Sequence, residues 1–140
     1  MRTRKQEAIM ATEFYESDPQ LSPDGRWLAY SADISGAYEV YLQSLTDGGA
    51  RRIRVSSQGG LRPRWKGDST ELFYTSADRR GITAVRSASG RWDDAKAEAL
   101  FTTPSDMPGY DVLPDGQSFV IIQTTPGPSD NLFHVILGWH

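Results

Sequence analysis

Residues 21–31 read Leu-Ser-Pro-Asp-Gly-Arg-Trp-Leu-Ala-Tyr-Ser, a turn followed by a segment of aromatic and apolar residues. Proline fixes φ at the second turn position, aspartate can hydrogen-bond nearby backbone groups, and glycine can take the position that needs a positive φ. A turn of this composition between two extended segments predicts a β-hairpin.

The same pattern occurs twice more along the chain. Residues 63–75 read Pro-Arg-Trp-Lys-Gly-Asp-Ser-Thr-Glu-Leu-Phe-Tyr-Thr, and residues 110–122 read Tyr-Asp-Val-Leu-Pro-Asp-Gly-Gln-Ser-Phe-Val-Ile-Ile. The turn aspartates of the three copies are 44 and 47 residues apart. We expect a structural role in these turns for Pro23, Asp24, Gly25, Asp68, Pro114, Asp115 and Gly116.

Further strand candidates follow each copy, at residues 38–45 and 51–55, at 82–86 and 97–102, and at 132–137. A repeat of this length with four short antiparallel strands is typical of a β-propeller blade. The sequence therefore predicts an all-β fold with three blades' worth of strands, about half of a six-bladed propeller. Aromatic residues at matching strand positions should pack between the blades, namely Trp27, Tyr30, Trp65, Phe73, Tyr74 and Phe119.

The repeat resembles that of TolB-type, WD-repeat-like propellers, and is similar to the C-terminal sensor propellers of bacterial Ser/Thr kinases. Besides residues 21–31, the likeness rests on Glu39-Val40-Tyr41, Pro63-Arg64-Trp65, Glu71-Leu72-Phe73-Tyr74, Tyr110-Asp111-Val112 and Val135-Ile136-Leu137-Gly138-Trp139. It covers roughly residues 14–139. The resemblance implies a scaffold that binds a protein or a ligand, because kinase and peptidase activities in these relatives belong to separate domains.

The strand count divides residues 1–140 as one half-propeller. Residues 1–15 would supply the outer strand of a last blade, followed by blade 1 at 16–58, blade 2 at 59–104 and three strands of blade 3 at 105–140.

An open half-ring would expose apolar blade faces and unpaired strand edges. Two chains could remove both problems as a symmetric dimer in which each N-terminal strand completes the last blade of its partner. The alternative is that the chain is a fragment of a larger propeller whose other blades are missing.

The composition excludes several kinds of chemistry and of binding partner. The chain has no cysteine, so it has no disulfide and no thiol nucleophile. Its net charge of −3 gives no bias toward nucleic acid. There is no apolar run of the roughly 18 residues that a membrane span needs, and residues 1–10 lack the apolar core of a secretory signal. If the chain is complete, we expect it in the cytoplasm.

Catalytic patterns are missing from the sequence. There is no Gly-x-Ser-x-Gly motif and no Asp-x-Asp-x-Asp calcium loop. His134 and His140 are the two histidines, and no carboxylate accompanies them in their segment. We therefore predict no catalytic residue, no metal site, no cofactor and no enzymatic activity.

Charge distribution supplies the candidate site. Residues 51–66 hold six Lys and Arg residues without Asp or Glu, and residues 97–140 hold acidic residues without Lys or Arg. Arg62 and Arg64 lie on the innermost strand of blade 2, where a channel-facing basic cluster would suit an anionic ligand or an acidic peptide. The alternative is that the basic and acidic zones are solvated or meet at blade or subunit contacts.

Three classes of function remain from these observations. The favoured one is a non-enzymatic binding and assembly module that associates with a second copy. The second is a sensor or gating propeller of a larger kinase or peptidase, and the third is an enzyme that works in the propeller channel.

Overall fold

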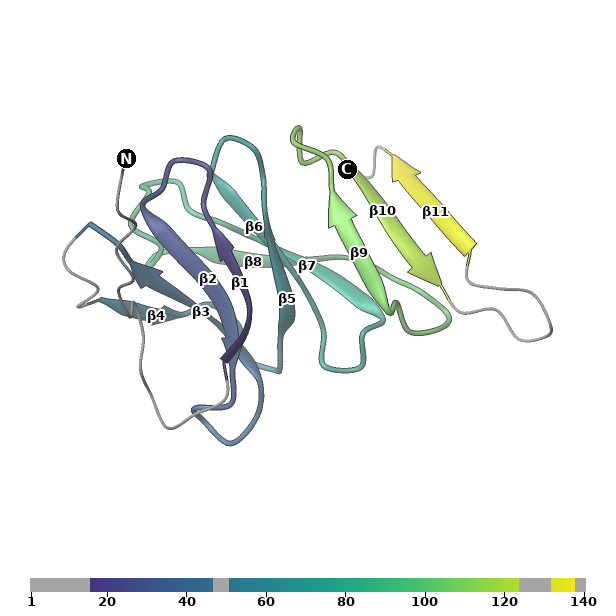
Figure 1. The fold of residues 1–140 in the computed structure, drawn as a ribbon, viewed down its shortest axis with the longest axis horizontal. Coiled ribbons are helices and arrows are strands. Elements are labelled where there is room, and N and C mark those ends of the chain that lie inside the picture. The colour runs from purple at the N-terminus through teal and green to yellow at the C-terminus, as the bar shows by residue number, and fades with distance from the viewer. Residues whose placement is uncertain (1–15, 47–50, 124–131, 138–140) are drawn as a thin grey trace, which may run out of the picture.

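The computed structural model describes residues 16–46, 51–123 and 132–137, and every regular element in these ranges is a β-strand. The strands form three antiparallel sheets that lie side by side (Figure 1). The first sheet contains β1 (Glu16–Leu21), β2 (Trp27–Ala32), β3 (Glu39–Ser44) and β4 (Arg52–Arg54). The second contains β5 (Leu61–Trp65), β6 (Glu71–Thr75), β7 (Gly81–Arg86) and β8 (Lys96–Thr102). The third contains β9 (Gly109–Val112), β10 (Ser118–Gln123) and β11 (Leu132–Leu137).

In each sheet the strands follow one another in chain order, each paired with the next. The first strands of the sheets contact one another, β5 with β1 and β5 with β9. They are therefore the inner strands of three blades, and β4 and β8 are outer strands. The predicted all-β propeller fold is confirmed. The strand expected within residues 1–15 lies outside the described part of the chain.

The hairpin turn after β1 shows how local sequence fixes the fold. The Gly25 amide donates to the Ser22 carbonyl at 2.9 Å, with Gly25 at a φ of 76°. The Asp24 carboxylate accepts from the Ser22 hydroxyl at 2.6 Å and from the Arg26 amide at 3.0 Å. Two of these bonds satisfy the backbone N–H groups of Gly25 and Arg26, which do not take part in strand pairing.

The corresponding turns of the three blades also contact one another. The Asp24 amide donates to the Ser69 hydroxyl at 3.1 Å, and the Gly67 amide donates to the Pro114 carbonyl at 2.9 Å. A Cβ on Gly67 would lie 2.8 Å from the Pro114 oxygen, so this contact requires glycine. These turns lie along the upper edge of the molecule in Figure 1 and tie neighbouring blades together.

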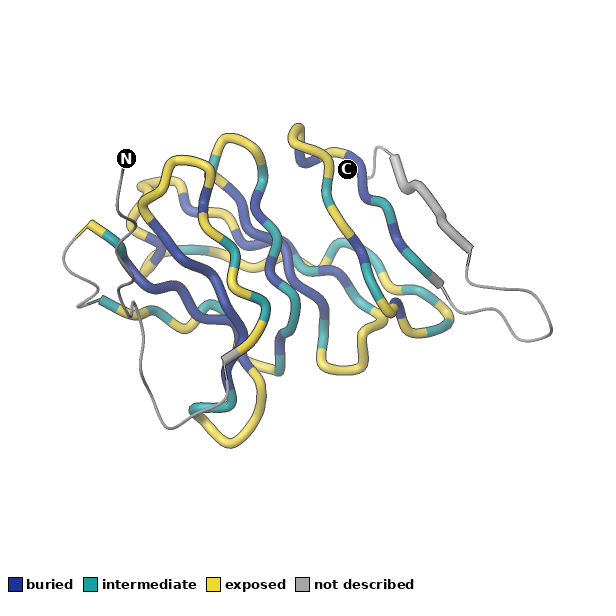
Figure 2. The backbone as a smooth tube through the Cα atoms, viewed as in Figure 1, coloured by how far each residue is buried: buried dark blue, intermediate teal, exposed yellow. Residues whose placement is uncertain are grey.

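Two apolar clusters hold the three sheets together, and the buried stretches run along the middle strands (Figure 2). The first sheet packs on the second through Trp27, Ala29, Val40, Leu42, Trp65, Leu72, Tyr74, Val85 and Trp92. The second packs on the third through Phe73, Ile82, Ala84, Met107, Tyr110, Phe119 and Ile121. The predicted burial of the matching aromatic residues is confirmed.

The opposite face of the first sheet is apolar as well. Leu28, Tyr30, Ala32 and Tyr41 form a third buried cluster there, in which the Tyr30 and Tyr41 rings stack with centroids 5.9 Å apart. Successive strand residues point to opposite faces, so β2 sends Trp27 and Ala29 toward the second sheet and Leu28 and Tyr30 away from it. Apolar residues on both faces are expected of a blade that has a neighbour on each side.

The β6–β7 connection repeats the same turn with different residues. The Arg79 amide donates to the Ser76 carbonyl at 2.9 Å. The Asp78 carboxylate accepts from the Ser76 hydroxyl at 2.5 Å and from the Arg80 amide at 3.0 Å. These bonds, the one from the Ser76 side chain first, hold the pKa of Asp78 below its usual value of 3.8.

Asp78→Asn is expected to lower the melting temperature at pH 7, because asparagine keeps an acceptor oxygen but loses the charge that strengthens these bonds. The folded-state pKa is depressed, so the stabilisation is present above the unfolded-state pKa and disappears as pH falls through the lower, folded-state pKa. Melting curves recorded from pH 7 down to pH 2 should therefore show the two proteins converge at the acid end. The same substitution at Asp106, an exposed loop aspartate, is the control and should leave the melting temperature at pH 7 unchanged.

Candidate functional site

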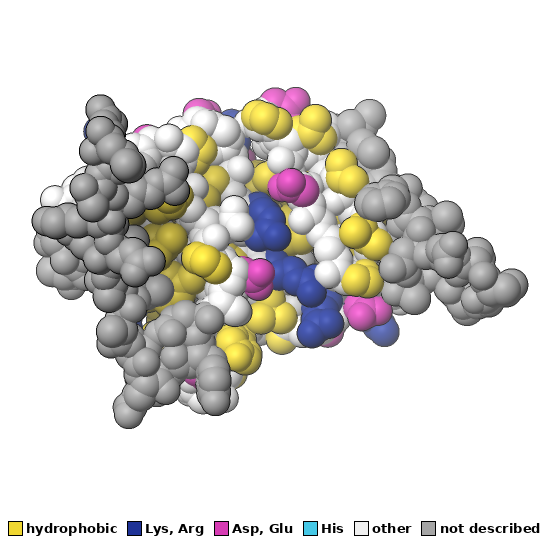
Figure 3. All heavy atoms as spheres, viewed as in Figure 1, with side chains coloured by type: hydrophobic (Ala, Val, Ile, Leu, Met, Phe, Trp, Pro, Cys, Tyr) yellow, Lys and Arg dark blue, Asp and Glu magenta, His cyan; other side chains and the backbone are white. Residues whose placement is uncertain are grey.

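The two arginines singled out by the charge pattern lie on inner strand β5, half-buried beside the β8–β9 connection and β9. The Arg62 Nη1 donates to the Met107 carbonyl at 3.0 Å. The Arg64 guanidinium lies over the Tyr110 ring, with Cζ 5.7 Å from the ring centroid, and its Nη1 donates to the Pro63 carbonyl at 2.8 Å. Basic side chains gather over β5 in the middle of the face shown in Figure 3.

The backbone at Arg62 is unusual. Its φ is 55°, and the equivalent residue of β1, Asp18, has a φ of 54°. Each precedes a proline, at the 44-residue spacing of the repeat. The left-handed region costs a non-glycine residue about 1–2 kcal/mol. Strand pairing shifts register at both places, so both inner strands carry a bulge. Bulges redirect side chains, and strained backbone often marks a functional position.

Tyr110 supports the bulge of β5 from the third sheet. Its hydroxyl donates to the Arg62 carbonyl at 2.5 Å. Burial raises the pKa of Tyr110, and Asp111 and Asp18 add to the rise while Arg64 and Arg62 oppose it. The phenol therefore stays protonated at neutral pH and remains a donor to the bulge.

A hollow of about 280 Å³ lies beside the two bulges. We call it the inner-strand hollow, and its lining is Ser17, Asp18, Tyr38, Leu61, Arg62 and Arg79. Tyr38 comes from the β2–β3 connection and Arg79 from the β6–β7 turn, at the end of the sheets opposite to the three repeat turns. Buried Met107 links two of the walls, because its amide donates to the Arg79 carbonyl at 2.8 Å while its carbonyl accepts from Arg62.

The arginines near this hollow have no acidic partner within the described ranges. The ion pairs found there are Arg51–Asp93, Lys66–Asp68 and Arg86–Glu71. Asp18 lines the same hollow, but its carboxylate is farther than 4.0 Å from the guanidinium nitrogens. A guanidinium has five N–H donors, and Arg62 uses one of its donors on Met107. The hollow can therefore offer charged donors to an anion.

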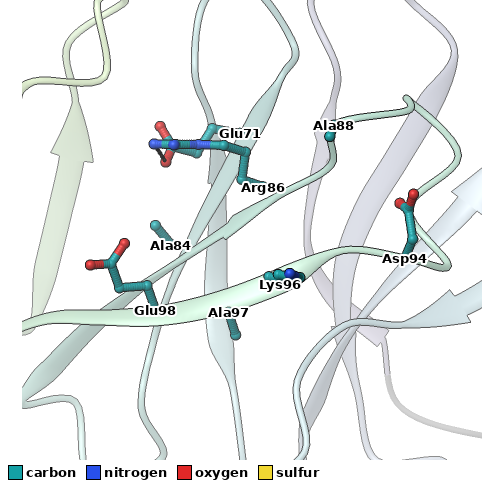
Figure 4. A pocket seen from close by; sticks show the side chains of 8 residues that line it. All are labelled: Glu71, Ala84, Arg86, Ala88, Asp94, Lys96, Ala97 and Glu98. Carbon is teal, nitrogen blue, oxygen red and sulfur yellow. Dashed lines mark hydrogen bonds and ion pairs between the residues drawn. The ribbon is translucent and has the colours of Figure 1, made fainter.

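A second hollow, of about 420 Å³, lies on β6, β7 and β8 (Figure 4). The side chains that rise around it include Glu71, Arg86, Lys96 and Glu98. The Arg86 Nη2 donates to the Glu71 carboxylate at 2.9 Å. This hollow combines charges of both signs and already contains an ion pair, so it attracts an anion less than the inner-strand hollow does.

The structure adds three findings on the other sequence candidates. Across residues 16–46, 51–123 and 132–137 no three His, Asp or Glu side chains converge as a metal site would need. No helix in those ranges is long and apolar enough to cross a bilayer. The backbone of His134 lies on β11 opposite Ile121, whereas its side chain and the whole of His140 lie outside what the structure describes.

Sequence reasoning selected Arg62 and Arg64 but missed Asp18, Tyr38 and Arg79. For Asp18 and Arg79, the sequence did contain a pattern that could have identified them. The Asp-Pro and Arg-Pro pairs at 18–19 and 62–63 recur at the repeat spacing, and residues 76–79 share the Ser-x-Asp pattern of residues 22–25. The link through Met107 joins residues far apart in the chain, and the sequence contains no pattern that indicates it.

Comparison with known proteins identifies relatives of the fold. No protein-family model matches the chain. It is 37% identical over 102 residues to the uncharacterized peptidase YuxL of Bacillus subtilis (strain 168), an alignment that covers 72% of this chain and 14% of that protein.

Solved structures agree on the architecture at low sequence identity. A structure with a provisional TolB assignment from Agrobacterium tumefaciens matches 90% of this chain and 46% of its own, with a TM-score of 0.66 and 15% identity. The oligogalacturonate lyase of Vibrio parahaemolyticus matches 82% of this chain and 31% of its own, with a TM-score of 0.64 and 15% identity.

A third match is the β-propeller domain of the Trilobed protease of Pyrococcus furiosus, which is described as having an open velcro topology. It covers 91% of this chain and 41% of its own, with a TM-score of 0.60 and 15% identity. This chain thus spans less than half the length of each protein compared. Its three sheets share the blade fold of TolB-type β-propellers.

Proposed function

We propose that the chain is a non-enzymatic binding and assembly module, a half-propeller that completes its ring with a second copy of itself. The observation that supports this most directly is the apolar cluster on the first sheet formed by Leu28, Tyr30, Ala32 and Tyr41. The described strands outside this sheet pack on its other face, through β5. In a ring, this is the face toward the preceding blade, and in the single chain its four side chains are at most 7% exposed.

The third sheet offers the complementary surface. Val120 and Ile122 alternate with buried Phe119 and Ile121 along β10, and they are half-buried on the face that points away from the second sheet. Joining this face to the first sheet of another copy, twice, gives six blades related by a two-fold axis. Apolar burial at two such joints supplies the free energy of association.

The outer edge of the third sheet suggests how a partner strand would attach. In the first two sheets a fourth strand pairs beyond the third, β4 on β3 and β8 on β7. In the third sheet β11 pairs with β10, and within the described residues nothing pairs on its other edge. We propose that residues 1–15 of the partner form this fourth strand. The open velcro topology of the Trilobed protease propeller suggests the simpler variant, in which the ring closes without strand exchange.

Light scattering of the purified chain tests the assembly. We expect the mass of two 15.6-kDa chains and a melting temperature that rises with protein concentration. Deletion of residues 1–15 should weaken the dimer if strand exchange closes the ring and leave it intact if the faces alone do so. A stable monomer at all concentrations would contradict the two-copy ring.

A second candidate is a gating or sensor propeller of a larger enzyme. The identity to the uncharacterized peptidase YuxL favours it, because the chain matches a short part of a much longer protein. On this hypothesis the remaining blades belong to the same polypeptide, and the isolated chain stays monomeric or aggregates through its apolar faces. The same light-scattering measurement therefore distinguishes the two candidates. The similarity to kinase sensor propellers remains a prediction.

A further inference from the structure

We propose that the inner-strand hollow binds a carboxylate group, held by the guanidinium groups of Arg62 and Arg79 and carried either by a small organic acid or by an acidic peptide. The inference deepens the proposed binding role and rests on it, but it does not require the two-copy ring, because every lining residue belongs to one chain.

Packing brings the two arginines to the same hollow from different strands. Arg62 lies on the bulge of β5 and Arg79 on the β6–β7 turn. Met107 accepts a hydrogen bond from the Arg62 side chain and donates one to the Arg79 backbone. Its side chain is fully buried, so this link is part of the core between the second and third sheets. The Arg62 side chain and the Arg79 backbone are therefore fixed before a ligand arrives, which lowers the entropy cost of binding.

Turn formation does not explain why an arginine stands at position 79. Arg79 has a φ of 62°. Several other turns place glycine at such a left-handed position, namely Gly25, Gly36, Gly90 and Gly116, while the β5–β6 turn has the small residue Ser69 there. Arginine pays a conformational penalty there that glycine avoids. The Arg79 side chain is exposed and has no ion pair in the described structure. A ligand contact accounts for a side chain that the fold itself does not use.

The same strain occurs at Arg62. Its left-handed backbone turns the carbonyl toward the Tyr110 hydroxyl. Two cationic residues of one hollow thus lie in a backbone conformation that L-residues seldom adopt. Backbone strain of this kind persists where the surrounding structure enforces the conformation, and strained residues are common at ligand-binding sites.

The rest of the lining selects the class of anion. Asp18 adds a negative charge to the hollow, which disfavours a doubly charged phosphate more than a singly charged carboxylate. Tyr38 is 40% exposed, and together with half-buried Leu61 it provides an apolar surface beside the arginines. A carboxylate joined to an apolar or aromatic group fits both features, and the planar guanidinium matches a carboxylate through paired hydrogen bonds.

Backbone amide NMR titration at low salt tests the proposal with four probes. These are phenylacetate, its neutral analogue phenylacetamide, inorganic phosphate, and a blocked peptide of alternating glutamate and leucine. The test variant is Arg79→Gly, which removes the guanidinium and relaxes the turn. Arg91→Ser is the matched control, because it removes the same charge from an exposed residue that does not line the hollow.

We expect phenylacetate or the peptide to shift the amide signals of the hollow, with phenylacetamide and phosphate binding at least tenfold more weakly. Arg79→Gly should weaken carboxylate binding about tenfold or more, as loss of a charge-assisted hydrogen bond does, while its melting temperature stays equal or rises. Arg91→Ser should bind within twofold of the parent chain. Binding of phenylacetate indicates a small acid as the ligand, and binding of the peptide alone indicates an acidic peptide.

The proposal is overturned if both carboxylates bind no better than phenylacetamide, if phosphate binds equally well, or if Arg79→Gly binds unchanged. Light scattering on the same samples separates this result from the fate of the ring. A dimer without carboxylate binding overturns the site and keeps the assembly, whereas a monomer that binds carboxylate keeps the site and overturns the two-copy ring.

Discussion

Replacing Trp65 by alanine should destabilise the fold by about 3–5 kcal/mol, the usual cost of removing a large buried aromatic side chain. Trp65 is 9% exposed and lies between the first and second sheets. Its ring meets that of Trp92 edge-on, with centroids 5.4 Å apart, and its Nε1 donates to the Gln20 carbonyl at 2.9 Å. The substitution therefore opens a cavity and removes a hydrogen bond between two blades.

Urea unfolding followed by circular dichroism measures this loss. Trp65→Phe separates the two contributions, because it keeps most of the packing and loses the indole donor, and we expect it to cost about 1–2 kcal/mol. Tyr38→Ala is the control at an exposed aromatic and should change the stability by less than about 0.5 kcal/mol. If Trp65→Ala costs no more than this control, the first two sheets are not held together by the Trp65 contact.

The fold was predictable because its information is local and repeated. Each hairpin turn carries its own residues for turn formation, as Asp24 and Gly25 show by bonding within four residues. The repeat then indicates that the units are equivalent, and the aromatic positions of one unit locate those of the next. Tyr30 and Tyr74, each six residues after its turn aspartate, are both buried.

The site was predictable in part, for the same physical reason. Charge clustering along the chain is visible in the sequence and identified Arg62 and Arg64. The inner-strand hollow depends instead on the sign of φ at Asp18, Arg62 and Arg79. At Asp18 and Arg62 these values arise where proline, strand pairing and contacts with a neighbouring blade compete, whereas the Ser-x-Asp pattern of residues 76–79 indicates the turn that places Arg79. The link through Met107 depends on how the second and third sheets pack, so it appears in the structure alone.

Phe119→Ala should cost about 3–5 kcal/mol as well, but at the other joint. Phe119 has no exposed surface, and its ring centroid lies 4.9 Å from that of Phe73, 5.8 Å from that of Phe101 and 6.4 Å from that of Tyr110. Aromatic pairs in these geometries contribute beyond their buried area. Phe119→Leu, which keeps most of the volume, should cost less than about 1.5 kcal/mol.

Hydrogen exchange shows where the loss of Phe119 acts. Within the described residues, the third sheet contacts the second through the Phe119 cluster, the Arg64–Tyr110 pair and the hydrogen bonds of Tyr110 to Arg62 and of Gly67 to Pro114. In a repeat protein, stability is roughly a sum of units and of the interfaces between neighbours. The amides of β9 and β10 should therefore lose protection first in Phe119→Ala, while β2 and β3 keep theirs. Uniform loss of protection over all three sheets would contradict this prediction and would show that the blades unfold as one cooperative unit. Val120→Ala, on the opposite face of the same strand, is the control and should leave the joint protected.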